Sequence, residues 1–313
     1  MKLHDLVEAY IDYKRSLGMR LRSQAAVLQS YCRHMGDICV DDVKAESVLA
    51  FVAGTGPVTT RWFETYTVLA GLYQYAISRG FATKSPLPVN LPHRPPPFAA
   101  YVYTVDELER LLAATDFLQS VLSPMLALTM RTTLLLLYGT GMRIGEALSL
   151  TLQDVDLGEH LITVRDTKFF KTRLVPIGPR LGKALRHYHS CRCTLPLPAG
   201  ANSAFLATRT GIHLNYKRVN KLFCRIREAA GIRRQGARYQ PRLHDIRHTA
   251  AVHRVIGWYR AGANVQALLP KLATYLGHLD IRSTQCYLSM TSELLQEASF
   301  RFERYANQEV CHA

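Results

Sequence analysis

Residues 243–250 read LHDIRHTA and residues 272–288 read LATYLGHLDIRSTQCYL. The first stretch contains His244 and Arg247, and the second contains His278 and, nine residues later, Tyr287. Core packing does not explain this set, because charged side chains are almost never fully buried without partners. A phosphodiester does, because in-line displacement builds negative charge on the non-bridging oxygens, and fixed Arg and His donors stabilise that charge. The two stretches therefore predict a phosphoryl-transfer site.

A second guanidinium group lies upstream, in residues 139–146, which read GTGMRIGE. Arg143 follows the two glycines of this segment, and Glu146 lies one helical turn later, where it can orient the guanidinium group. Guanidinium groups bind phosphate oxygens bidentately and stay charged throughout a reaction. A lone Arg in a basic chain is usually a solvated surface residue, and a lone His is more often structural. Only the joint pattern favours a shared site.

Together these motifs resemble the tyrosine recombinase/integrase family, the site-specific DNA recombinases that include the Xer proteins and phage integrases. The resemblance is tight over residues 139–177 and 243–290 and loose elsewhere. It implies that the protein cleaves and rejoins DNA strands through a 3′-phosphotyrosyl intermediate, which keeps the energy of the phosphoester. Double-stranded DNA is therefore the expected substrate, and no ATP, metal or other cofactor is expected.

The resemblance also implies a role for each motif residue. Tyr287 is the nucleophile, and its phenol needs nearby cations or a base because its free pKa is about 10. Arg143 and Arg247 bind the scissile phosphate. His244 accepts the proton of the Tyr287 hydroxyl, and His278 donates a hydrogen bond to the phosphate.

The general acid is expected in residues 166–171, which read DTKFFK. The resemblance assigns Lys168 to this role, protonating the departing 5′ oxygen, when the position is counted back from Leu174 and Pro176. Lys171 is then the later, non-catalytic lysine and a candidate DNA contact. The alternative interpretation of either lysine is a solvated residue in a turn.

The composition favours a polyanionic partner. The 313 residues include 39 Lys and Arg against 24 Asp and Glu, which leaves a net charge of +15. A merely solvated basic surface is the alternative, and a membrane is a weaker one, because there is no isolated polybasic tail and no apolar run of eighteen residues. The seven cysteines are odd in number and scattered, which indicates reduced thiols in a cytosolic protein. The resemblance adds a bacterial, nucleoid-associated location.

The length predicts two domains. Helical spacing at about 3–17, 24–35, 43–52 and 59–78 predicts a small all-α domain over residues 1–83, which matches the core-binding module of the family by size and order. Residues 84–100 contain six prolines and predict an extended basic linker. Its Lys84 and Arg94 suit a strap along DNA, although a plain spacer explains them equally well.

Residues 101–313 are predicted to form a mixed, mostly α catalytic domain that completes a DNA clamp. A capping box at Thr104 and Glu107 opens it, and strands at 161–165 and 172–177 predict a β-hairpin. The fold class is therefore mainly α with a small β-sheet. A last helix, Ser292–Tyr305, has an apolar stripe that suits docking either on a neighbouring subunit or on its own domain. The resemblance implies a tetramer acting on two duplexes and leaves room for accessory proteins.

Four alternative functions remain beside site-specific recombination as an integrase, transposon recombinase or resolvase. A type IB topoisomerase uses similar chemistry, and a non-catalytic DNA-binding protein can keep the same fold. A zinc hydrolase is suggested by His244 and His248 at i and i+4, but Arg247 shares their face and Asp replaces the usual Glu. Dinucleotide binding at residues 139–145 lacks both the glycine spacing and a preceding strand. The segment HYHSCRC, residues 187–193, matches no standard zinc module.

Overall fold

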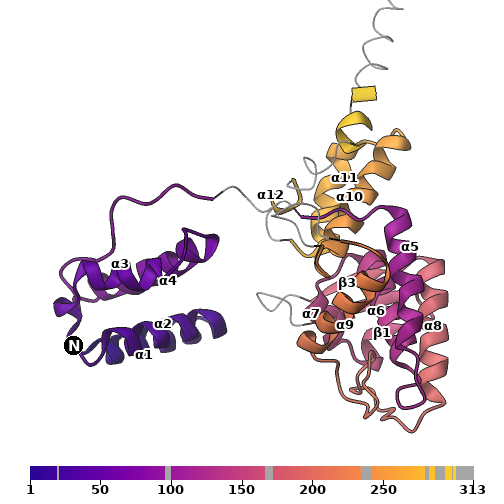
Figure 1. Ribbon diagram of the computed structural model, residues 1–313, viewed down its shortest axis with the longest axis horizontal. Helices are drawn as coiled ribbons and strands as arrows, with labels where there is room; N and C mark the ends of the chain where they lie inside the picture. Colours follow the sequence, from indigo (N-terminus) through magenta and orange to yellow (C-terminus); the bar gives the residue numbers. More distant parts are fainter. Residues whose placement is uncertain are drawn as a thin grey trace, which may run out of the picture. The chain divides into compact units, whose positions relative to one another are not determined.

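The structure is a computed structural model that describes residues 1–19, 21–95, 100–165, 172–233, 241–278, 282–285, 293–297 and 299–300 (Figure 1). The chain divides into two compact units, Met1–Phe98 and Ala99–Ala313. No helix in these described ranges is both long enough and apolar enough to cross a membrane.

The first unit is helical, as predicted. Its helices are α1 (Leu3–Ser16), α2 (Arg22–Met35), α3 (Ala45–Ala53) and α4 (Thr60–Ser78), with a short 3₁₀ turn, Val40–Asp42. Each α-helix carries an apolar stripe, and the four stripes share one core. At its centre the hydroxyl groups of Tyr31 and Tyr73 are hydrogen-bonded at 2.7 Å, so these two buried phenols satisfy each other.

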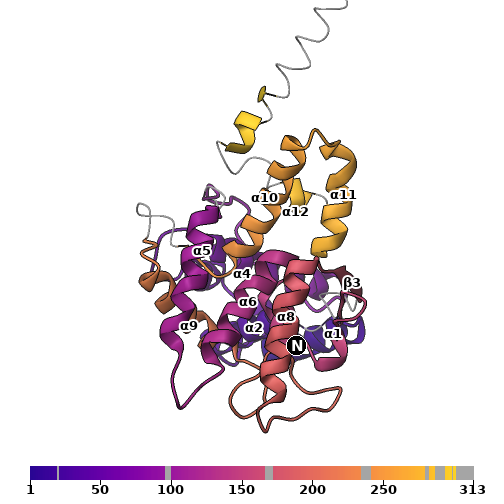
Figure 2. The same ribbon diagram turned by 90° about the vertical axis from the view of Figure 1, so that its right-hand side faces the viewer.

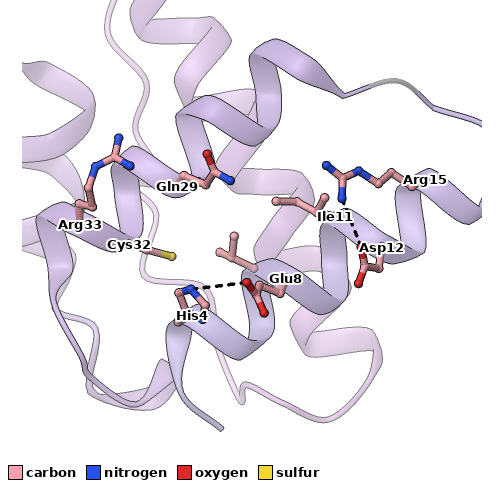
Figure 3. Close-up of a pocket in the computed structure, with 9 residues that line it drawn as sticks. His4, Glu8, Ile11, Asp12, Arg15, Gln29, Cys32 and Arg33 are labelled. Atoms are coloured by element: carbon pink, nitrogen blue, oxygen red, sulfur yellow. Dashed lines mark hydrogen bonds and ion pairs between the residues drawn. The ribbon is translucent and has the colours of Figure 1, made fainter.

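A hollow of about 560 Å³ lies between α1 and α2 (Figure 3). Two ion pairs along α1 border it, His4–Glu8 at 3.6 Å and Asp12–Arg15 at 3.5 Å. Arg33 of α2 lies on its other side. The two carboxylates balance the two guanidinium groups, so the hollow lacks the excess positive charge that a polyanion site requires.

The described part of the proline-rich segment, residues 84–95, has no helix or strand and packs on the first unit. Tyr66 donates a hydrogen bond to the Pro88 carbonyl at 3.3 Å. The Arg94 guanidinium lies 4.9 Å from the centre of the Phe63 ring, a cation–π contact. Lys84 is exposed. Pro88 and Arg94 of this segment therefore contact the helical unit.

The second unit is mostly helical around α6, which packs against α8 and α10 (Figure 2). Its described α-helices are α5 (Val105–Ala113), α6 (Leu126–Thr140), α7 (Ile144–Ser149), α8 (Pro179–Cys193), α9 (Tyr216–Ala229), α10 (Asp245–Arg260), α11 (Val265–Leu276) and α12 (Arg282–Gln285). The predicted capping box opens α5: Thr104 Oγ1 accepts from the Glu107 amide at 3.1 Å, and Glu107 accepts from the Thr104 amide at 2.9 Å.

The small sheet has the order β1 (Val155–Asp156), β2 (Leu161–Val164), β3 (Arg173–Pro176), and both pairings are antiparallel. The predicted hairpin is thereby confirmed. Ile162 pairs with Val175, and both are fully buried, so this pair fixes the register against the core. Val164 pairs with Arg173 at the open end. Lys168 and Lys171 belong to the connection beyond that end and lie outside the described residues.

The described residues of the last predicted helix, 293–297 and 299–300, are helical and pack on their own domain. Leu294 is 2 % exposed and belongs to a core cluster with Val255 of α10 and Leu272 of α11. Arg260 of α10 pairs with Glu293 at 2.5 Å and with Glu297 at 2.9 Å. Of the two interpretations of this helix, its first turns therefore fit docking on the same chain.

Candidate active site

Arg143 is placed by the turn between α6 and α7. Gly141 ends α6 with φ +61°, a left-handed conformation that favours glycine, and a Cβ there would approach Leu276 Cδ2 to 2.6 Å. Met142 is fully buried after it, and Arg143 then precedes the first residue of α7 with extended backbone angles. The GTGMR segment therefore ends α6, buries Met142 and leaves Arg143 partly exposed at the start of α7.

The Arg143 guanidinium is anchored by two partners. Its Nη1 donates to Glu146 Oε1 at 2.9 Å, and its Nη2 donates to the Gly277 carbonyl at 3.1 Å. The Arg143 amide donates to Glu146 Oε2 at 2.9 Å. The side chain is nevertheless 36 % exposed, so it combines a fixed position with access for an anion.

Arg247 is nearly buried, at 3 % exposure, and binds the carboxyl ends of two helices. Its Nη1 donates to the Gly141 carbonyl and its Nη2 to the Leu276 carbonyl, each at 2.8 Å. Carbonyl groups at helix C-termini lack helical partners and carry partial negative charge. They stabilise the buried cation, whose positive charge favours an anion at this end of α11.

His278 contacts this cation directly. Its Nε2 lies 2.8 Å from Arg247 Nη2, and because a guanidinium has donors only, Nε2 is the acceptor. Nδ1 then carries the proton and donates to Oγ1 of the buried Thr284 in α12, at 2.7 Å. Burial and the charges of Arg247 and Arg143 lower the pKa of His278 to about 4, so it is neutral at neutral pH.

His244 immediately precedes α10 in helical conformation (φ −66°, ψ −24°), one helical turn before Arg247. Burial lowers its pKa, and the charges of Arg247 and Arg143 contribute to the shift. The centres of the His244 and His248 rings are 5.0 Å apart. Burial and the neighbouring His244 lower the pKa of His248 to about 4. A neutral imidazole beside cations is the form that accepts a proton.

Two residues of the site were missed in the sequence. Arg173, the first residue of β3, forms a bidentate pair with Glu146, with Nη2–Oε2 at 2.7 Å and Nη1–Oε1 at 3.1 Å. Thr284 supports His278 from α12. The available signals were weak: a charged residue opening an otherwise apolar strand, and a polar residue three positions before Tyr287.

Glu146 is the carboxylate of the cluster, and it stays ionised. Burial alone would raise its pKa, but hydrogen bonds and charges from Arg173 and Arg143 outweigh burial and lower the pKa to about 2. The ionised form therefore stabilises the fold at any pH above the ordinary carboxyl pKa. That contribution is lost only as the pH falls toward 2.

Tyr287, Lys168 and Lys171 lie outside the described residues. The nearest competing phenol, Tyr275, is described and is committed to structure. Its hydroxyl lies 3.3 Å from the Pro176 carbonyl and 3.5 Å from the Gly139 carbonyl. Burial raises its pKa, which opposes formation of a nucleophilic phenolate.

The arrangement gathers three guanidinium groups, one carboxylate and neutral imidazoles around the C-terminus of α11, which makes it an anion site.

Asp245, the acid of the zinc-hydrolase alternative, is fully buried and accepts from the Arg242 amide and side chain, each at 2.8 Å. It is therefore not free to act as a base. Among the described residues no group of three or more His, Cys, Asp or Glu is arranged to hold a metal. The dinucleotide alternative fails because Gly139 lies inside helix α6, so a helix and not a strand leads into this segment.

The buried histidines predict how stability depends on pH. His278 and His248, each with a pKa of about 4 in the folded chain, regain their ordinary pKa on unfolding. The unfolded state then binds more protons at these histidines between pH 6.5 and pH 4, so their contribution to the free energy of unfolding falls as the pH drops through this window and levels off below it. Denaturant titrations at a series of pH values measure the slope. His278→Gln should flatten it, His4→Gln at an exposed position should not, and equal slopes in both variants would contradict the assignment.

A mainly helical fold with a small antiparallel sheet, and with Arg143, Arg247 and His278 gathered at the C-terminus of α11, defines the class of tyrosine-type site-specific recombinases. Residues 102–293 match the phage integrase family, and the chain belongs to that family.

Two relatives cover three quarters or more of this chain. It is 30% identical over 304 residues to y4rB of Sinorhizobium fredii, named as an integrase/recombinase, with 95% of this chain and 96% of that protein covered. It is 29% identical over 244 residues to the tyrosine recombinase XerC of Oceanobacillus iheyensis, with 77% and 73% covered.

Two solved structures share the fold. The Tn1549 transposon integrase in complex with a circular intermediate DNA has a TM-score of 0.69 at 17% identity, covering 96% of this chain and 99% of that one. The lambda integrase tetramer bound to a Holliday junction has a TM-score of 0.68 at 16% identity, covering 92% and 77%.

Proposed function

We propose that this recombinase cleaves and rejoins DNA by transesterification, with Tyr287 as the nucleophile and a 3′-phosphotyrosyl intermediate. The observation that carries the proposal is the convergence of Arg143, Arg247 and His278 on the C-terminus of α11, where Arg143 binds Gly277 and Arg247 binds both Leu276 and His278. Three residues from distant parts of the sequence thereby face one small region with excess positive charge. A single phosphate fits such a region.

A residue of this chain is assigned to each step of the proposed reaction. The Tyr287 oxygen attacks phosphorus, its P–O bond forms, and the bond to the 5′ oxygen breaks. His244 takes the phenol proton, and Lys168 gives a proton to the departing oxygen. Arg143 and Arg247 stabilise the charge that develops on the non-bridging oxygens. One phosphoester replaces another, so neither ATP nor a metal is required.

Covalent geometry supports Tyr287 in this role. It follows Gln285, the end of α12, by two positions, and two residues span at most about 7 Å. Thr284 in α12 contacts His278, and Leu294 beyond Tyr287 packs on α10 of the same chain. Tyr287 is therefore only three positions along the chain from Thr284, which contacts His278.

His278 must change its hydrogen bonding when a phosphate arrives. With Nε2 accepting from Arg247, it has no proton to offer at that atom. The Thr284 hydroxyl can donate as well as accept, so it keeps a bond to Nδ1 if the proton moves to Nε2. We expect this tautomer change to accompany phosphate binding, because the low pKa of His278 opposes full protonation.

The proposed partner is double-stranded DNA, with Lys84, Arg94 and Lys171 as candidate backbone contacts. The DNA-bound lambda integrase tetramer and Tn1549 integrase, which share the fold, support binding of DNA and a tetrameric assembly. Accessory proteins are compatible with this assembly, and the proposed setting is the bacterial cytoplasm, on the nucleoid.

A suicide DNA duplex, nicked so that the leaving strand diffuses away, tests the reaction. Protein trapped on this DNA is digested, and the attached residue is mapped by mass spectrometry. Attachment at Tyr287 is expected. Attachment at another residue, or no adduct on any of the duplexes tested, would contradict the proposal. A topoisomerase would instead relax supercoiled DNA without a specific site.

DNA binding should weaken steeply with salt. Each phosphate neutralised by Lys or Arg releases counterions, and a protein with six to ten such contacts loses about 10³-fold or more in affinity between 50 and 200 mM salt. Titrations of labelled duplex over this range measure the slope. A flat response would contradict a basic clamp.

A further inference from the structure

The geometry points to Arg173 as a positioning residue: it holds Arg143 in its phosphate-binding position by neutralising and fixing Glu146. This inference deepens the proposed function and rests on it. Arg173 is distant in sequence from every residue assigned to the reaction except the lysines of its own hairpin.

Arg173 is built to hold protein groups and not a ligand. Its Nη1 and Nη2 bind the two oxygens of Glu146, and its Nε donates to the Tyr275 carbonyl at 3.2 Å. All three nitrogens are therefore engaged. The side chain is 12 % exposed, against 36 % for Arg143. Of these two guanidinium groups, only that of Arg143 is open to a phosphate.

Arg173 also shapes the second anchor of Arg143. Gly277 has φ +71°, and a Cβ there would lie 2.7 Å from Arg173 Nη1 and 2.9 Å from its Cζ. The guanidinium occupies the space that a side chain at position 277 would need. The Gly277 carbonyl accepts from Arg143 Nη2. Arg173 therefore binds one of the groups that hold Arg143, the Glu146 carboxylate, and lies beside the residue that supplies the other, Gly277.

Charge explains why this matters for catalysis. Glu146 and Arg143 alone form a neutral pair, in which the carboxylate competes with a phosphate for the guanidinium. Arg173 adds a second positive charge and donates one hydrogen bond to each oxygen of the Glu146 carboxylate. Arg143 then keeps an uncompensated positive charge for the scissile phosphate.

The position of Arg173 links this anchor to the general acid. Arg173 begins β3, five residues after Lys168 and directly after the connection that carries it. Opposite it, Val164 ends β2. The segment that carries Lys168 is thus attached at one end to Arg173, the residue that fixes Arg143. A shift of Arg173 would therefore disturb both Arg143 and the Lys168 segment.

The hairpin offers a matched control. Arg165 follows β2 at the other end of the same connection and pairs with the buried Asp154 at 2.6 Å. This pair also joins an arginine to a buried carboxylate, but among the described contacts Asp154 bonds Thr151 and Arg165 and does not touch Arg143. Arg165→Gln therefore removes an ion pair of the same hairpin, formed by an arginine that is 54 % exposed, without touching the Arg143 anchor.

The test measures the single-turnover rate of covalent adduct formation on suicide DNA at saturating protein, with DNA affinity and thermal unfolding alongside. We expect Arg173→Gln to slow the adduct by about 100-fold, a loss that a misplacement of about 1 Å can cause. DNA affinity should change by less than about threefold, because the many other phosphate contacts remain. Arg173→Lys should recover part of the rate. Arg165→Gln should stay within threefold of the wild-type rate, and an equal loss in both variants would overturn the inference.

A double variant separates positioning from mere support of the fold. If the harm comes from the unneutralised carboxylate, Glu146→Gln added to Arg173→Gln should raise the adduct rate above that of Arg173→Gln alone. A further loss in the double variant would overturn the inference. Should Arg173→Gln unfold below the assay temperature, the comparison is made between Arg173→Lys alone and Arg173→Lys combined with Glu146→Gln. A wild-type protein without adduct contradicts the proposed function; a wild-type adduct with an unaffected Arg173→Gln contradicts only this inference.

Discussion

Tyr287→Phe is expected to form no covalent adduct with DNA while binding DNA with wild-type affinity. The substitution removes one hydroxyl group and keeps the ring, so packing around position 287 changes little. The reaction changes completely, because phenylalanine has no oxygen to form the bond to phosphorus. Adduct formation should fall below detection, a loss of at least about 10³-fold when a nucleophile is deleted.

Tyr275→Phe is the matched control. It deletes the same atom from the nearest tyrosine of the catalytic unit, whose hydroxyl faces the Pro176 and Gly139 carbonyls. Loss of such a hydrogen bond costs about 1 kcal/mol of stability, and the adduct should still form. The measurement is gel separation of protein–DNA adducts on suicide duplex. Full-yield adduct from Tyr287→Phe, or its loss in Tyr275→Phe alone, would remove Tyr287 from the nucleophile role.

The second large effect is expected for Arg247→Lys. The charge survives, but a lysine cannot reproduce a planar fork that binds two backbone carbonyls and an imidazole at once. At least one carbonyl at the end of α6 or α11 is left without this donor, at a cost of about 1–3 kcal/mol for a buried unsatisfied group. The phosphate also loses a preorganised donor, which lowers the adduct rate by about 10²–10³-fold.

Arg254→Lys provides the comparison for this variant. Arg254 lies on the same helix, two turns further along, and its side chain is exposed. Stability and adduct rate should both stay close to wild type. Chemical denaturation and single-turnover kinetics measure the two quantities. An Arg247→Lys protein as active as Arg254→Lys would show that Arg247 does not bind the reacting phosphate.

Local patterns predicted most of the elements. The helices of the first unit, the capping box at Thr104 and the hairpin are confirmed, because each depends on residues close together in sequence. Hydrophobic periodicity and caps act over one or two helical turns, which a reading of the chain samples directly. The family also followed from short motifs, since reactive side chains at fixed spacings are visible without coordinates.

The amino-acid sequence by itself determined the two helical units, the hairpin and the family, together with the side chains that can carry the chemistry. Only the tertiary structure decided what holds those side chains. Arg173 meets Glu146 across 27 positions, and Arg247 meets the Gly141 carbonyl across 106. Every residue has a backbone carbonyl, so such an acceptor leaves no mark in the sequence. A bond of this kind is defined only when helix ends and strand ends are brought together in space.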